Sequence, residues 1–213
     1  MDEYSYEYEG DRRYCYPGSS ILINLLNITD SSFNEAERRF TAITTLEVMR
    51  NPVPGKFDLK HLMSIHKAIF GGIFVWAGKL REVNISKGNQ FCQSAYLVDC
   101  ATELFAKLKD ESYLATTTSE EFPIRLAYYL SEINVLHPFR EGNGRTQRMF
   151  IDYLARYNGY HLNFSNVSGQ EMIEASALAF NMNYSKLEAI VLRAIEATTV
   201  EERDAFRKAI KMP

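Results

Sequence analysis

Residues 137–148 read His-Pro-Phe-Arg-Glu-Gly-Asn-Gly-Arg-Thr-Gln-Arg, and this stretch decides how the rest of the chain is interpreted. The segments on both sides have apolar residues at helical spacing, which predicts a loop between two helices. Gly142-Asn143-Gly144 permits backbone conformations that point several N–H groups at one place. These amides meet the N-terminus of the next helix, where the helix dipole favours an anion. The sequence therefore predicts an anion site in this loop.

The charged residues of the same stretch indicate what the anion is. Arg145 and Arg148 are three residues apart, which puts both guanidinium groups on one helix face, suited to a chain of phosphates. Glu141 fits a Mg²⁺ ion, because one carboxylate with phosphate oxygens and water is a usual shell for that ion. His137 can accept a proton near pH 7. Together these groups predict phosphoryl or nucleotidyl transfer, and Phe139 is expected to anchor the loop in the core.

Each of these residues also has a simpler interpretation when it is taken alone. A histidine before proline is commonly a helix end, Gly-Asn-Gly is an ordinary turn, and an isolated glutamate is a solvated acid. The combination favours a functional site, because two basic residues at a helix N-terminus need an anion.

Hydrophobic periodicity predicts a single, mostly helical domain. Helices are expected at 31–49, 58–70, 98–109, 118–136 and 145–157, followed by two or three more over 170–197 and 201–211. Ser32 with Glu35 forms a capping-box pattern at the start of the first helix, whose inner face is predicted to hold Ala36, Phe40 and Ile43. Residues 80–93 predict one short hairpin with its turn at Lys87-Gly88-Asn89.

Composition narrows the class of protein. A chain of 213 residues with 46% hydrophobic residues can bury one core, and a net charge of −3 disfavours a nucleic-acid groove. No apolar run is long enough to cross a bilayer, so no membrane partner is expected. Three cysteines without a CxxC pair predict reduced thiols and a cytoplasmic protein. His61 and His66 are five residues apart on different helix faces, which favours structural roles over metal binding.

The stretch at 137–148 resembles the signature of the Fic family, His-x-Phe-x-Asp/Glu-Gly-Asn-Gly-Arg-x-x-Arg, at every fixed position. The resemblance extends upstream through 74–81 and 85–88 and covers about 57–195. It implies an all-α Fic-type domain with a short β-hairpin flap, which transfers AMP from ATP to a Tyr, Ser or Thr hydroxyl of a target protein. The chain then divides into a tyrosine-rich arm (1–20), an N-terminal region with an inhibitory helix (21–56), the Fic domain (57–197) and a C-terminal helix (198–213).

The resemblance also implies a role for each residue of the signature. His137 would deprotonate the target hydroxyl, and Glu141 would hold Mg²⁺ against the α- and β-phosphates. The amides of Gly142, Asn143 and Gly144, together with Arg145, would cradle the phosphates, and Arg148 would hold the γ-phosphate.

Two further regions carry implied roles. Lys87 and Gly88 lie on the flap, which would cover the nucleotide and bind the target as an added strand along 82–92. Ser31 to Ala36 resembles the family's inhibitory pattern, Ser/Thr-x-x-x-Glu-Gly/Asn, apart from Ala36. Glu35 would then pair with Arg148 and prevent productive binding of the γ-phosphate, although Ser32 and Glu35 equally suit a helix cap.

Three other functions compete with adenylyl transfer. The same fold could transfer phosphate or phosphocholine, it could remove AMP with Glu35 assisting a water, or it could bind nucleotide without turnover. The intact arginines of the signature favour AMP transfer from ATP, and the tyrosine-rich arm is a candidate for self-modification. The sequence predicts no oligomeric state.

Overall fold

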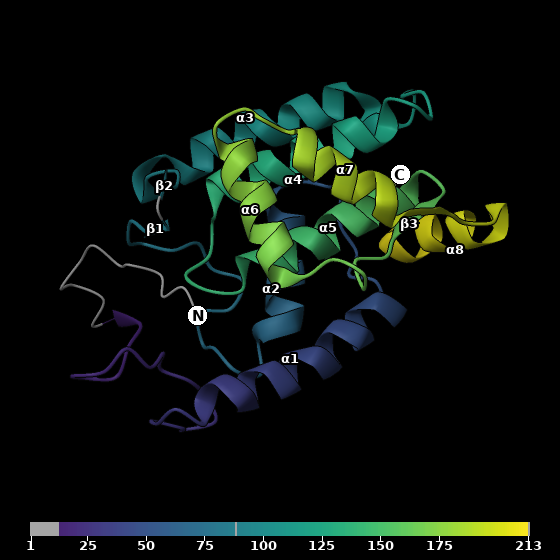
Figure 1. The fold of residues 1–213 in the computed structure, drawn as a ribbon. Coiled ribbons are helices and arrows are strands. Elements are labelled where there is room, and N and C mark those ends of the chain that lie inside the picture. Colours follow the sequence, from purple (N-terminus) through teal and green to yellow (C-terminus); the bar gives the residue numbers. More distant parts are fainter. Residues whose placement is uncertain (1–12, 88, 213) are drawn as a thin grey trace.

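The structure is a computed structural model that describes residues 13–87 and 89–212, with only the backbone at Lys87. The described helices and strands run in chain order as follows: α1 (Phe33–Arg50), α2 (Leu59–Phe70), β1 (Ser86–Lys87), β2 (Asn89–Gln90), α3 (Leu97–Asp110), α4 (Phe122–Leu136), α5 (Asn143–Tyr157), β3 (Tyr160–Leu162), α6 (Gly169–Phe180), α7 (Ser185–Ala194), β4 (Ile195–Ala197) and α8 (Val200–Ile210). Two short 3₁₀ turns, at Ser94–Tyr96 and Ser112–Leu114, flank α3. This mostly helical architecture with one small flap hairpin confirms the predicted fold class (Figure 1).

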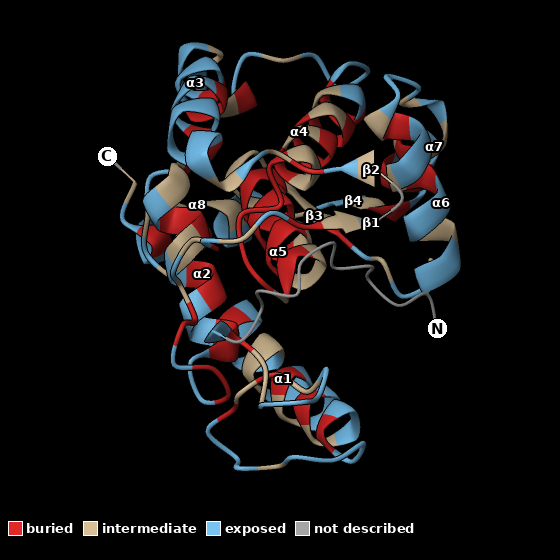
Figure 2. Cartoon of the chain, turned by 90° about the vertical axis from the view of Figure 1, so that its left-hand side faces the viewer, coloured by how far each residue is buried: buried red, intermediate tan, exposed pale blue. Residues whose placement is uncertain are grey.

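Helix α5 is the centre of the domain. It packs against α2, α4 and α8, and its side chains from Met149 to Ala155 are buried. Figure 2 shows α5 as a mainly red helix surrounded by the others. Because the signature loop leads directly into α5, the loop is fixed on the most buried element of the chain.

The predicted hairpin is present but shorter than expected. β1 and β2 pair antiparallel with Ser86 opposite Gln90, and the side chains of Ile85 and Phe91 next to the strands are buried. A second ladder joins β3 to β4 and was not predicted. Its strands have three residues each, too few for an alternating pattern to be recognised.

Helix α1 has the predicted extent but a different inner face. Phe33, Glu37, Thr41 and Val48 are buried, whereas Ile43 is 61% exposed. The predicted inner face is therefore wrong at Ile43, because two polar residues turn inward toward α5. The expected capping box is also absent: Ser32 makes no side-chain cap and instead donates from its hydroxyl to Asp30.

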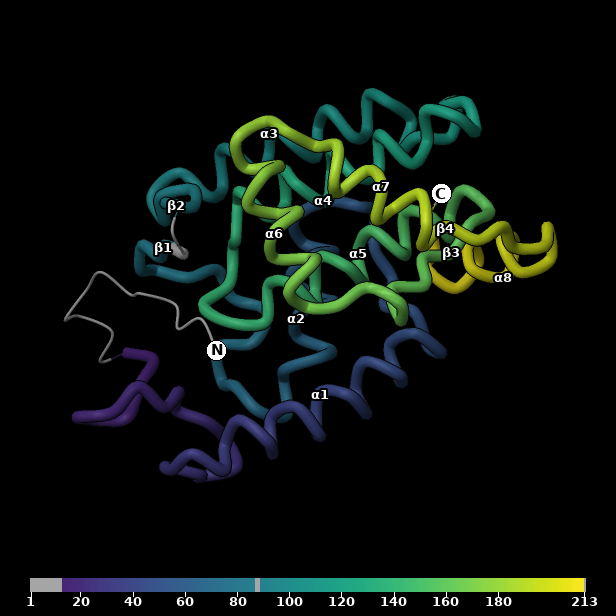
Figure 3. Tube along the Cα trace, viewed as in Figure 1, coloured from purple at the N-terminus to yellow at the C-terminus, as the bar shows by residue number. Residues whose placement is uncertain are grey.

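The described part of the N-terminal arm is packed on the domain. Cys15 and Leu22 form a β-bridge, and the ring of Tyr14 packs edge-on against Trp76 at 5.6 Å between centroids. Figure 3 shows this purple segment beside the start of α1. The expectation of a poorly ordered arm is thus wrong for 13–20, while the expected ring packing is confirmed at Tyr14. The remaining part of the predicted arm lies outside the described residues.

None of the helices within 13–87 and 89–212 is both long enough and apolar enough to span a membrane.

Candidate active site

His137 is the residue at which α4 ends. It adopts a left-handed conformation (φ 44°, ψ 58°), which turns the chain sharply into the signature loop. Its ring stacks on Phe91, with 3.8 Å between the centroids and 17° between the planes. The histidine is 5% exposed and lines a cavity. The imidazole of His137 is therefore close enough to act on a ligand bound in that cavity.

The hydrogen bonding of His137 indicates which of its ring nitrogens carries the hydrogen. Nδ1 lies 3.3 Å from the carbonyl oxygen of Asn134. A carbonyl oxygen only accepts, so Nδ1 carries a hydrogen in the neutral ring and Nε2 has the lone pair. Nε2 is therefore the atom that can take a proton.

The signature loop is braced by its own asparagine. The side chain of Asn143 accepts from the amide of Phe139 at 2.9 Å and donates to the Phe139 carbonyl at 2.7 Å. Gly142 has φ +82°, and a Cβ there would lie 2.4 Å from Cζ of Phe70, so only glycine fits. The first intrahelical bond of α5 runs from Thr146 N to the Gly142 carbonyl. The amides of Asn143, Gly144 and Arg145 precede that bond, which supports the predicted anion site.

His66 on α2 is a buried histidine that contacts the signature loop. The amide of Gly78 donates to Nδ1 of His66 at 2.8 Å, so Nε2 carries the hydrogen and donates to the Glu141 carbonyl at 2.9 Å. The His66 ring also stacks on Phe139 at 3.9 Å. Burial lowers the pKa of His66 to about 4, which keeps the ring neutral. Phe139 is fully buried, as predicted, and the structural role expected for His66 is confirmed.

His61 is structural as well. It accepts from the amide of Phe57 through Nδ1, and its Nε2 lies 2.9 Å from the Val53 carbonyl. Burial lowers its pKa too.

The cavity beside His137 has a volume of about 510 Å³, within the usual range for a small-molecule site. The polar lining of the cavity includes His137, Gly144 and Arg148, together with Asn134 and Gln147. The apolar side comes from α6 and the segment before it, and includes Phe164, Val167, Met172, Ile173 and Phe180. A ligand with a charged end and a flat apolar end matches this division.

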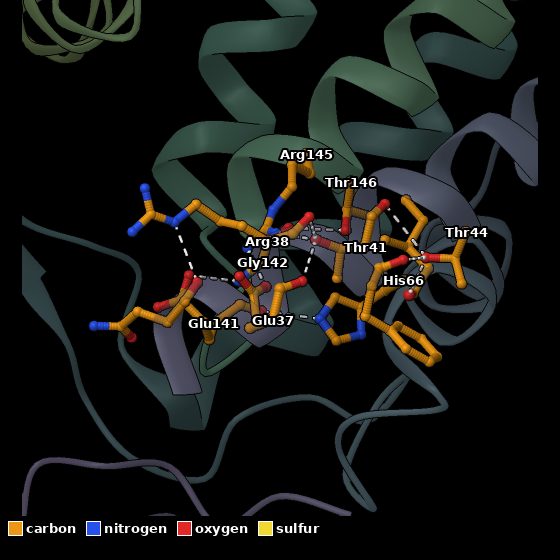
Figure 4. A network of polar contacts seen from close by, with 12 residues as sticks. Glu37, Arg38, Thr41, Thr44, His66, Glu141, Gly142, Arg145 and Thr146 are labelled. Carbon is orange, nitrogen blue, oxygen red and sulfur yellow. Dashed lines mark hydrogen bonds and ion pairs between the residues drawn. The ribbon is translucent and has the colours of Figure 1, made fainter. Parts of the chain in front are cut away.

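The two signature arginines point to different places. Arg148 lines the cavity, and its guanidinium lies back over Gly144, where a Cβ would be 3.1 Å from Nη1. Arg145 instead turns to α1, where its guanidinium is 2.6 Å from the Glu37 carboxylate and donates to the Thr41 hydroxyl (Figure 4). The prediction that both guanidinium groups share one face is therefore wrong, because a buried carboxylate on α1 attracts Arg145.

Glu141 lies at the start of α5. One oxygen of its carboxylate accepts from the amide of Gly142 at 2.9 Å, which fixes the side chain against the helix N-terminus. Within the described residues, no group of three or more His, Cys, Asp or Glu side chains could hold a metal ion by itself. A single carboxylate next to an anion site is nevertheless the donor set that Mg²⁺ uses when phosphate oxygens and water complete its shell. The residues present fit that ion.

Glu35 does not form the predicted contact with Arg148. The Glu35 side chain is 66% exposed, and its carboxylate pairs with Arg39 on the next turn of α1. Ser31, the other residue of the predicted inhibitory pattern, is exposed. Glu37 is two residues later, which places it about 200° around the helix axis from Glu35, on the side that faces α5. Helix α1 therefore approaches the signature through a residue that the pattern did not include.

The roles predicted for the two flap residues Lys87 and Gly88 stay predictions. Gly88 lies outside the described residues, and at Lys87 only the strand backbone is described. The sequence interpretation missed three residues that contact the site: Glu37, Arg81 and Phe91. For Glu37 a signal existed, since a glutamate at the centre of an otherwise periodic helix face has to meet a partner.

Known proteins with a related sequence decide the family. The family description "Fic/DOC family" matches residues 56–155. A Sinorhizobium fredii protein named "Probable protein adenylyltransferase y4lH" is 38% identical over 85% of this chain and 94% of its own length. The chain belongs to the Fic/DOC family. Protein adenylyltransferase VbhT of Bartonella schoenbuchensis is 40% identical over 92% of this chain, which spans 42% of that relative's length.

A solved Fic structure has the same fold. The N-terminal Fic domain of a VirB-translocated Bep effector protein from Bartonella quintana, with bound ADP, superposes with a TM-score of 0.83 and 27% identity. The match covers 88% of this chain and 96% of that one. The Fic-type fold inferred from the signature is thereby confirmed.

Proposed function

We propose that this Fic protein is a protein adenylyltransferase, which transfers AMP from ATP to a Tyr, Ser or Thr hydroxyl of a target protein. The observation that carries the proposal is that His137 and Arg148, from the two ends of the signature, line one cavity with an anion-binding helix N-terminus beside it. Relatives named protein adenylyltransferase and an ADP-bound Fic structure support the same reaction.

His137 acts as the general base of this reaction. The target oxygen attacks the α-phosphorus, the bond to pyrophosphate breaks, and the hydroxyl proton goes to Nε2. Nδ1 donates to the Asn134 carbonyl, so in the neutral ring Nε2 has the lone pair that accepts this proton. The stack on Phe91 fixes the plane of the His137 ring at the wall of the cavity.

The phosphates bind at the start of α5. The amides of Asn143 and Gly144 and the guanidinium of Arg148 supply hydrogens and positive charge where negative charge develops on the leaving pyrophosphate. Glu37 and Thr41 hold the guanidinium of Arg145 against α1, and we propose that this arginine contributes its main-chain amide to the anion site.

Glu141 would hold Mg²⁺ with phosphate oxygens. The ion supplies neutralising charge for the phosphates. The flap is where we propose that an extended target segment adds a strand, since β1 and β2 are the two strands of this sheet within the described residues.

Incubation with α-labelled ATP and Mg²⁺, with the chain alone and with a cell lysate, tests the proposal. Wild-type protein should transfer the label, and His137→Ala should lower the rate at least about 100-fold, the usual size of a general-base contribution. His161→Ala is the matched control, because His161 contacts Asp152 and Glu196 away from the cavity.

A parallel incubation with γ-labelled ATP identifies the transferred group. AMP transfer predicts no incorporation from γ-labelled ATP and an added mass equal to that of AMP less one water. Label transferred from the γ-position, or full labelling by His137→Ala, would contradict the proposal.

A further inference from the structure

Arg81 is a buried arginine that makes all of its side-chain hydrogen bonds to main-chain carbonyls. It is 2% exposed and lies between α2 and the flap. Nη1 donates to the Val83 carbonyl at 2.7 Å, and Nη2 donates to the carbonyls of Cys92 and Leu136. Nε donates to the carbonyl of His137 at 2.8 Å. One planar group thus joins both ends of the flap to the end of α4.

The surrounding main chain strengthens this connection. The amide of Arg81 donates to the Pro138 carbonyl at 2.9 Å, and the amide of Cys92 donates to the Val135 carbonyl at 2.9 Å. The chain on both sides of His137 is therefore bound to the flap segment.

An arginine suits this position for a physical reason. Its five N–H groups form a rigid fork that can reach several carbonyls at once, whereas a lysine offers one point charge. Burial lowers the pKa of Arg81 to about 10, so the group still carries its charge at neutral pH. Within the described residues no carboxylate forms an ion pair with it, and the carbonyl dipoles offset the cost of burying the charge.

The backbone of His137 needs such support. A left-handed conformation at a residue other than glycine costs about 1–3 kcal/mol and persists where neighbouring contacts hold it. The Arg81 side chain contacts the carbonyls on both sides of that strained residue, at Leu136 and at His137 itself.

We propose that Arg81 is the positioning residue for His137, and that it couples the base to the flap; this inference rests on the proposed function. Arg81 does not line the cavity, so it contacts no nucleotide bound there. Its loss should therefore reduce the rate of AMP transfer at saturating ATP and leave the affinity for ATP almost unchanged.

The test compares Arg81→Gln and Arg81→Lys with wild-type protein. A displacement of about 1 Å in a catalytic group can cost about 100-fold in rate, and we expect that loss in Arg81→Gln. The ATP concentration that gives half of the maximal rate should change less than about 3-fold. The Kd of a non-hydrolysable ATP analogue, measured by calorimetry, should also change less than about 3-fold. Arg81→Lys should recover part of the rate, because it restores the charge and some of the donors.

Arg207→Gln is the matched control. Arg207 on α8 also donates to a main-chain carbonyl, that of Tyr157 at the C-terminal end of α5, at 2.8 Å. This contact is at the opposite end of α5 from the signature loop. This variant should keep the wild-type rate. Folding of each variant is checked by circular dichroism and its melting curve; if Arg81→Gln does not fold, the rate of Arg81→Lys decides.

Nitrogen-15 spectra of the histidine rings give a readout that does not depend on activity. Signals of His137, assigned with His137→Asn, should shift or broaden in the Arg81 variants, while those of His161 stay in place. Unchanged His137 signals together with an unchanged rate would overturn the inference, as would a rate loss matched by an equal loss of nucleotide affinity. Absence of labelling by wild-type protein would instead count against the proposed function, and the spectra would still decide the role of Arg81.

Discussion

The carboxylate of Glu37 on α1 lies 2.6 Å from the guanidinium of Arg145 on α5, and only 10% of the Glu37 side chain is exposed. The same guanidinium lies over the ring of Phe70 and donates to Thr41. Helix α1 is thus fixed to the signature by a largely buried ion pair, whose partners come from distant parts of the chain.

Replacing Glu37 with Gln should destabilise the protein. Removing one charge of a mostly buried pair leaves the other without compensation, and since Arg145 is 28% exposed we expect a loss of about 1–3 kcal/mol. Glu35→Gln is the control on the same helix; its exposed pair with Arg39 should be worth less than about 0.5 kcal/mol. Urea unfolding of both variants measures the difference, and equal losses would show that the Glu37 pair does not fix α1.

Gly142→Ala should be far more damaging than Gly18→Ala. Both glycines have positive φ, +82° and +73°, but a Cβ at Gly18 meets nothing within 4 Å, whereas at Gly142 it overlaps Phe70. The conformational part alone costs about 1 kcal/mol, which is what Gly18→Ala should show. Melting temperatures and nucleotide binding of the two variants separate the clash from the conformation. Similar melting temperatures would mean that Phe70 moves away easily.

Stability should fall as the pH drops from 6.5 toward 4. Burial holds the pKa of folded His66 at about 4, below its unfolded value of 6.5, so the unfolded chain binds more protons in this window. A shift of that size corresponds to at most about 3 kcal/mol. Urea unfolding at several pH values should show a weaker dependence in His66→Gln, which keeps a donor and an acceptor. An identical slope in the variant would assign the effect to other groups.

Phe91→Leu should slow AMP transfer without preventing folding. Leucine keeps the buried apolar volume but loses the flat surface that stacks on His137, and we expect about a 10-fold lower rate at saturating ATP, a small part of what positioning contributes. Phe91→Tyr keeps the flat ring and should stay within about 3-fold of wild type, since stacking is retained. If leucine and tyrosine behave alike, the stack has no part in orienting the base.

The signature and the helices around it could be predicted because their information is local. His137, Phe139 and Gly142 have roles that follow from a helix end, an apolar anchor and a turn within one short stretch. The pattern at Ser32 and Glu35 is equally local, and it led to a wrong prediction. It describes one turn of a helix and carries no information about which face of that helix meets α5.

Contacts between distant segments could not be predicted in this way. Nothing in the spacing of Arg145 reveals that Glu37 draws it away from the cavity. Arg81 and His66 look like ordinary members of a loop and a helix until the fold brings carbonyls of the signature loop to them. These residues act through the main chain, which has the same chemistry at every position and leaves no sequence pattern.

Because Arg81 donates its hydrogen bonds to main-chain carbonyls, the flap can accept amino-acid substitutions. Arg81 binds carbonyl oxygens, which every amino acid provides, so side chains at Val83, Cys92 or Leu136 can be exchanged without removing one of its bonds. If the flap determines which target binds, its surface can be altered by evolution or by design while Arg81 keeps His137 in position. Libraries that vary Asn84 and Gln90, two exposed positions in the described part of the flap, and keep Arg81 are therefore a rational starting point for redirecting the proposed activity to new proteins.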